Sequence, residues 1–143
     1  MTEDEWLSCT DPILMLDLLR SAGQTCDRKL RLLAVACSRR IWHLIDDLGR
    51  AAIEVAEQFA EGHASAEVLR AARLACKSSG NNSAWYAAAS DPFIAARDAI
   101  LSAQSAGDSR TEQAKLVREI FGNPFRACEP ASSPCQAPPG YWE

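Results

Sequence analysis

The chain has 143 residues, a length typical of one domain that builds a hydrophobic core without support from disulfides or metals. Its 19 acidic and 15 basic residues give a net charge of −4. This balance argues against a general nucleic-acid binder, because affinity for phosphate backbones comes mainly from clustered lysines and arginines. No apolar run approaches the ~20 residues that span a bilayer, so we expect no membrane contact.

The start of the chain, MTEDEWLSCTDP, is acidic and lacks the charged and then apolar build of a secretory signal, so we expect a cytoplasmic protein. The sequence has six cysteines, and we expect reduced thiols, with the redox state of Cys128 and Cys135 left open. Two of them, Cys37 and Cys76, lie within helical patterns, where a thiol acts as a small hydrophobic group.

Two stretches carry the same helix-start signal, in which an Asp caps the helix and a proline fills its first turn. They are CTDPIL, with Pro12, and ASDPFI, with Pro92. Glycines are expected just after helices, because glycine adopts the left-handed conformation there at no steric cost. Five of them follow segments of helical periodicity, namely Gly23, Gly62, Gly80, Gly107 and Gly122.

The resulting fold prediction is all-α, a single bundle of about six helices, because no segment alternates with the period of a strand. The Pro- and Ser-rich segment at 127–143, ACEPASSPCQAPPGYWE, predicts an irregular tail, extended or disordered, beyond a helical domain at 1–126. A short helical turn is also expected at 83–89. The six helices are expected at 12–22, 27–47, 49–61, 65–78, 92–106 and 110–121.

The helix expected at 27–47 presents apolar residues on two sides. One side forms a continuous stripe that predicts the core face, made of Leu30, Leu33, Ala34, Cys37, Ile41, Leu44, Ile45 and Leu48. The other side mixes Leu32, Val35 and Trp42 with arginines and a histidine.

Two interpretations of that second side compete. In the first, the helix is central to the bundle and covered on both sides, which is usual for a helix that is apolar all round. In the second, the side is a patch that binds a protein partner, since Trp and Arg often carry interface energy. We favour the first, and expect Trp6 and Leu7 of the acidic N-terminus to pack on Trp42. The candidate interaction surface comprises Arg28, Arg31, Arg39, Trp42 and His43.

The sequence carries little catalytic or metal-binding chemistry. It contains no C-x-x-C, no H-x-x-x-H, no phosphate-binding glycine loop and no G-x-S-x-G, so we expect no metal, no cofactor and no catalytic residue. His43 precedes Asp46 and Asp47 by one helical turn, which leaves open an acid–base pair. The favoured interpretation is a histidine at a helix end, with Asp46 or Asp47 capping the next helix. A cysteine nucleophile is less favoured, because Cys37 lies on the core face.

The leading functional prediction is a non-catalytic protein-interaction module or adaptor with a protein partner. One alternative is a small enzyme that uses a His–carboxylate or cysteine site. The other is a nucleic-acid-associated regulator that uses the basic side of the 27–47 helix, with Arg28, Lys29, Arg31, Arg39 and Arg40.

Three stretches, TEDEWLSCTDPILML, DRKLRLLAVACSRRIWHLI and REIFGNPFR, resemble a family of uncharacterised helical proteins found in planctomycete-type bacteria. The resemblance covers residues 1 to about 126, and its most specific parts are RKLRLLAVACSRRIWHL and IFGNPFR. It implies a shared helical fold and supplies no activity, cofactor or catalytic residue. Members of that family continue past GNPFR into further helices, so the Pro-rich end of this chain suggests a shortened paralogue or a remnant of a longer protein.

Overall fold

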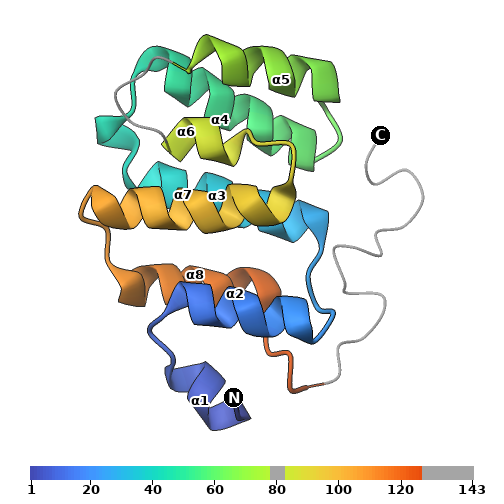
Figure 1. Cartoon of the computed structure of the whole chain (residues 1–143), viewed down its shortest axis with the longest axis vertical. Coiled ribbons are helices and arrows are strands. Elements are labelled where there is room, and N and C mark those ends of the chain that lie inside the picture. The colour runs from blue at the N-terminus through green and yellow to red at the C-terminus, as the bar shows by residue number, and fades with distance from the viewer. Residues whose placement is uncertain (78–82, 127–143) are drawn as a thin grey trace.

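A computed structural model describes residues 1–77 and 83–126 of the chain, and within them every regular element is a helix. The predicted all-α bundle is thus confirmed (Figure 1). In the described residues no helix is both long and apolar enough to cross a membrane. The elements are α1 (Glu3–Ser8), α2 (Pro12–Ser21), α3 (Asp27–Arg40), η1 (Trp42–Leu44), α4 (Asp47–Ala60), α5 (Ala66–Ala75), α6 (Ser83–Ala87), α7 (Pro92–Ser105) and α8 (Arg110–Phe121).

The two predicted Asp-Pro start signals work as expected. The side chain of Asp11 accepts hydrogen bonds from the backbone N–H groups of Ile13 and Leu14, and Pro12 opens α2. Asp91 caps α7 in the same way, ahead of Pro92. Four of the predicted terminal glycines have positive φ, and the fifth, at position 80, lies outside the described residues; the four are Gly23, Gly62, Gly107 and Gly122.

The bundle is organised around α3, which contacts α4, α6, α7 and α8. In Figure 1, α7 lies along α3, α2 and α8 lie on one side of this pair, and α4, α5 and α6 lie on the other. A first core lies among α1, α2, α3, α7 and α8, and includes Trp6, Leu33 and Val117. A second core lies mainly among α3, α4, α5 and α6, and includes Val35 and Ile53.

α3 is covered on both sides, which confirms the favoured interpretation of this helix. Leu33 and Cys37 of the expected core face are fully buried in the first core. Val35, from the second side, is 3% exposed and belongs to the second core. Arg31 is also buried, at 2% exposure, although the sequence places it among the candidate surface residues.

The prediction of one helix at 27–47 is wrong for its last turns. α3 ends at Arg40, η1 follows, and α4 begins at Asp47, where Asp46 accepts a hydrogen bond from the N–H of Gly49. This capping competes with continuation of the helix, because a capping Asp takes an extended backbone conformation. The change of direction removes Leu44 and Leu48 from the predicted core stripe, and their side chains are 47% and 52% exposed.

The first helix, α1, was not expected from the sequence. Thr2 and Glu5 form a capping box, in which each side chain accepts a hydrogen bond from the backbone N–H of the other residue. Trp6 is fully buried in the first core, while Leu7 is 49% exposed. The expected packing of Trp6 and Leu7 on Trp42 is therefore wrong, because Trp42 packs against the second core.

The predicted tail at 127–143, and with it the domain boundary after residue 126, lies outside the described residues. Among the cysteines that are described, Cys9, Cys37 and Cys76 are free thiols, in agreement with the prediction. Cys26 is disulfide-bonded, so the expectation of reduced thiols is wrong at that residue.

Candidate functional site

The structure divides the five candidate surface residues between the two ends of α3. Arg28 and Arg31 lie in its first turns, whereas Arg39 lies at its end and is followed by Trp42 and His43 in η1. Arg39 follows Arg28 by eleven positions, a rise of about 16 Å along a helix. The two groups therefore belong to two different surface features.

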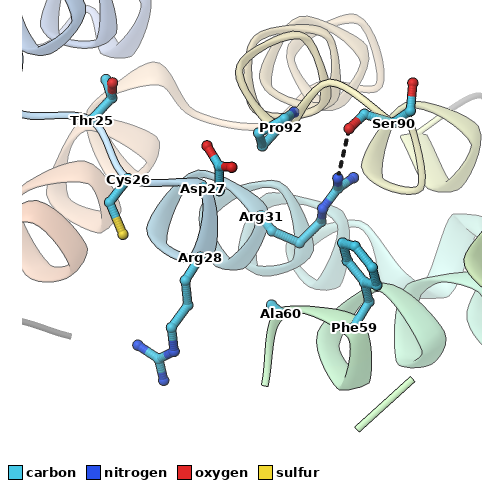
Figure 2. A pocket seen from close by; sticks show the side chains of 9 residues that line it. All are labelled: Thr25, Cys26, Asp27, Arg28, Arg31, Phe59, Ala60, Ser90 and Pro92. Carbon is cyan, nitrogen blue, oxygen red and sulfur yellow. Dashed lines mark hydrogen bonds between the residues drawn. The ribbon is translucent and has the colours of Figure 1, made fainter. Parts of the chain in front are cut away.

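The first feature is a cleft of about 600 Å³, named here the Arg31 cleft (Figure 2). One wall is formed by the residues that lead into α3 and by its first turn, from Thr25 to Arg28, together with Arg31. The other walls are the end of α4, with Phe59 and Ala60, and the approach to α7, with Ser90 and Pro92.

The guanidinium of Arg31 is held by backbone carbonyl oxygens of the segment between α6 and α7. Nη1 donates to the carbonyls of Ala87 and Ala89, the first at 2.9 Å, and Nη2 donates to the carbonyl of Ser90 at 3.4 Å. The last carbonyls of a helix lack partners within the helix, so Arg31 supplies donors that α6 needs. Its guanidinium carbon lies 5.4 Å from the ring centroid of Phe59.

Burial lowers the pKa of Arg31 below its ordinary value, while the negative charges of Asp27 and Asp91 oppose this shift. An arginine remains a cation in proteins at neutral pH even so. Arg31 thus places a positive charge at the inner wall of the cleft.

Arg28 has a different role at the rim. Its Nη2 lies 2.9 Å and 3.2 Å from the two carboxylate oxygens of Glu61, so the start of α3 is tied to the end of α4. Figure 2 shows Arg28 pointing away from Arg31. The N-cap residue of α3 is Cys26, and its side chain makes no capping hydrogen bond to the first turn of the helix.

The second feature is named here the corner surface and consists of Arg39, Trp42, His43, Leu44 and Leu48, where the chain passes from α3 to α4. Trp42 is partly buried, packs against the second core and lies near two arginines. The guanidinium carbons of Arg39 and Arg50 lie 5.9 Å and 5.3 Å from its ring centroid. Arg50 also donates to the carbonyl oxygen of Trp42, with Nη2 at 3.0 Å and Nε at 3.3 Å.

Sequence reasoning missed the two leucines of the corner surface and Arg50. The leucines match the apolar period of a continuous helix, so only the Asp46-Asp47 capping signal could have shown that they leave the core. It also missed Phe59 and Ser90, which approach Arg31 only through folding.

The structure gives no support to the His–carboxylate and cysteine sites. Within the described residues, no hydrogen bond joins the exposed His43 to Asp46 or Asp47. Burial raises the pKa of the Cys37 thiol to about 12, and thiolate is therefore scarce at neutral pH. No group of three or more His, Cys, Asp or Glu residues in residues 1–77 and 83–126 is arranged to hold a metal ion.

The basic residues proposed for the nucleic-acid alternative are largely neutralised within the chain. Arg28 pairs with Glu61, Arg39 pairs with Glu57 at 2.6 Å, and Arg40 pairs with Asp108 at 2.9 Å. A fourth, Arg31, is buried. These residues therefore form no continuous basic face of the kind that follows a phosphate backbone.

Comparison of the chain with known protein families, with curated proteins and with solved structures finds no match. The function of this protein is therefore argued from the geometry of the Arg31 cleft and of the corner surface.

Proposed function

We propose that this protein is a non-catalytic protein-interaction module and that the corner surface binds its protein partner. The observation that carries the proposal is the exposure of Leu44 and Leu48, at 47% and 52%, in the same corner of the chain as Trp42, whose ring lies near two arginines. Tryptophan and arginine are enriched among the residues that dominate interface energies, and exposed apolar side chains around them add surface that a partner can bury.

Charge favours a protein over a nucleic acid as the partner. Glu57 neutralises Arg39 at this surface, and the whole chain carries a net charge of −4. A binding surface of low local charge gains its affinity from burying apolar and aromatic groups, which a protein partner supplies. His43 lies exposed at the same surface, where it is available to donate or accept a hydrogen bond.

The proposal includes a cytoplasmic location. The free thiols of Cys9, Cys37 and Cys76 support it, because thiols persist in a reducing compartment. The disulfide at Cys26 is evidence against it.

Site-specific photo-crosslinking in the native host tests the proposed surface. A photoreactive residue replaces Leu48 at the corner surface or, as a matched control, Leu14, which is 54% exposed on α2. We expect a discrete adduct with one protein from position 48 and none from position 14. The adduct's partner is then purified, and Leu44→Asp and Leu48→Asp should each weaken its binding by at least about tenfold, or 1.4 kcal/mol.

Two results would contradict the proposal. One is the absence of any discrete adduct from position 48, and the other is unchanged affinity of the Leu44→Asp and Leu48→Asp variants. Circular dichroism of both variants establishes that they are folded, as expected for substitutions of exposed side chains.

A further inference from the structure

The hydrogen bonds of Arg31 leave unused donors on one edge of its guanidinium. A guanidinium has five N–H donors, and the three carbonyls of Ala87, Ala89 and Ser90 occupy three of them. Nε is buried and has no hydrogen-bond partner, and the single bond of Nη2 is long, at 3.4 Å. Nε and Nη2 lie on the same edge of the guanidinium plane, and this edge binds a carboxylate through two parallel hydrogen bonds.

Arg31 also lacks a close counter-ion in the part of the chain that the structure describes. Three other arginines of α3 each have a carboxylate at hydrogen-bond distance, namely Arg28, Arg39 and Arg40. Asp27 and Asp91 act on Arg31 only through their more distant charge. A buried charge is costly unless it is paired, so an anion that reached Arg31 would be stabilised there.

The cleft beside this edge has the size and lining of a small-molecule site. Its volume of about 600 Å³ falls within the range of known ligand pockets. Phe59, Ala60 and Pro92 provide an apolar wall next to the charge (Figure 2). A ligand that fits both features has an anionic group attached to an apolar or aromatic body.

The charges around the cleft distinguish between kinds of anion. The first turn of α3 adds the positive end of a helix dipole, which favours an anion. Asp27 lines the same cleft and repels negative charge. A single negative charge is therefore favoured over the double charge of a phosphate monoester.

We propose that the Arg31 cleft is a binding site for a small organic carboxylate. The carboxylate accepts hydrogen bonds from Nε and Nη2 of Arg31, and the apolar body of the ligand packs against Phe59 and Pro92. This site is separate from the corner surface, so either proposal stands if the other fails.

Nuclear magnetic resonance of the arginine Nε–H groups tests this binding in the unaltered full-length chain. The probe is phenylacetate at millimolar concentrations, and the matched control is the neutral amide phenylacetamide. We expect phenylacetate to shift the Arg31 Nε–H signal in a saturable way and phenylacetamide to leave it unchanged. Arg50 is the internal control, because a backbone carbonyl already occupies its Nε and Nη2 and it does not line the cleft.

Several results would overturn the proposal. They are an unmoved Arg31 signal, equal shifts with phenylacetate and phenylacetamide, and equal shifts at Arg31 and Arg50. Tighter binding of phenyl phosphate than of phenylacetate would overturn the assignment to carboxylates.

A substitution adds a second measurement. Arg31→Lys keeps the charge and removes the two-donor edge, so it should weaken phenylacetate binding at least about tenfold. Undiminished affinity in a folded Arg31→Lys variant would contradict the proposed contact. The titration of the unaltered chain decides the matter if this variant does not fold.

Discussion

Arg31 and Arg50 show how the same side chain acquires different roles from its surroundings. Both donate to backbone carbonyls and both lie near an aromatic ring. Arg50 directs its Nε and Nη2 edge at the carbonyl oxygen of Trp42 and fastens η1 to α4. Arg31 uses its Nη groups to hold the α6–α7 connection and leaves its Nε without a partner beside a cleft.

At the same scale, Leu33 is a direct test of the core assignment. Its side chain is fully buried in the first core, so Leu33→Ala should lower the free energy of unfolding by about 2–5 kcal/mol. Leu14→Ala is the control, because Leu14 is 54% exposed and its loss should change stability by less than about 0.5 kcal/mol. Urea denaturation of both variants measures the difference, and equal effects would contradict the assigned faces.

Cys37 predicts a dependence of stability on alkaline pH. Burial raises the pKa of its thiol from 9.0 to about 12, so the folded state holds a proton that the unfolded chain releases. The stabilisation is complete below pH 9 and is lost as the pH rises toward 12. Unfolding free energies of the wild type and of Cys37→Ala across this range isolate the effect. A difference between them that stays constant with pH would contradict it.

At the scale of the helix, capping signals decided which elements sequence reasoning found. Pro12 and Pro92 each follow a capping Asp, and both helices begin where the sequence predicts. The equally local signal at Thr2 is hidden in the sequence by an acidic composition. At Asp46 the expected cap of the next helix is confirmed, but an unbroken apolar period extends the predicted preceding helix too far. Helix boundaries depend on this competition between local hydrogen bonds and periodicity.

The candidate sites were less accessible to prediction than the helices. The sequence identified Arg28, Arg31, Arg39, Trp42 and His43 from a single helical wheel, which carries no information about neighbouring helices. Whether an arginine on that wheel is buried depends on partners far along the chain, such as the carbonyl of Ala89 for Arg31. Exposure and pairing are therefore tertiary properties that periodicity alone leaves undetermined.

The junction between η1 and α4 allows a test at this scale. A Cβ at Gly49 would lie 2.5 Å from Cγ2 of Ile45 and 3.3 Å from Cβ of Ala84. Gly49→Ala gains about 1 kcal/mol of helix propensity, but overpacking costs about 1–3 kcal/mol, so we expect a net loss of stability. Thermal denaturation measures it, and a stabilised variant would contradict the close packing at this junction.

A double variant locates the origin of that loss. If the clash with Ile45 dominates, Gly49→Ala combined with Ile45→Ala should destabilise the protein by less than the sum of the two single changes. Additive effects would place the strain elsewhere.

At the scale of the whole molecule, α3 and α7 join the two cores. Leu33 and Ile100 belong to the first core, whereas Val35 and Ala103 belong to the second. Each of these helices therefore contributes buried residues to both cores within two turns. Loss of one core would expose apolar surface in the other.

We therefore expect the two cores to unfold together. Native-state hydrogen exchange should give the same opening free energy for the slowest amides of α2, which borders the first core, and of α4, which borders the second. The calorimetric and van't Hoff enthalpies should also agree. A plainly lower opening free energy for one helix would show that the cores are independent.

The buried residues where α3, α6 and α7 meet are alanines, namely Ala34, Ala87, Ala89, Ala95 and Ala99, with the partly buried Tyr86 packed against them. The neighbouring methyl groups cannot adopt another rotamer to make room. A larger side chain at one of these positions would therefore push the helices apart. Pro92 at the start of α7 and Arg31 on α3 both line the Arg31 cleft. These alanines let α3 and α7 pack closely, and a larger side chain among them would therefore also shift two of the helices that line the cleft.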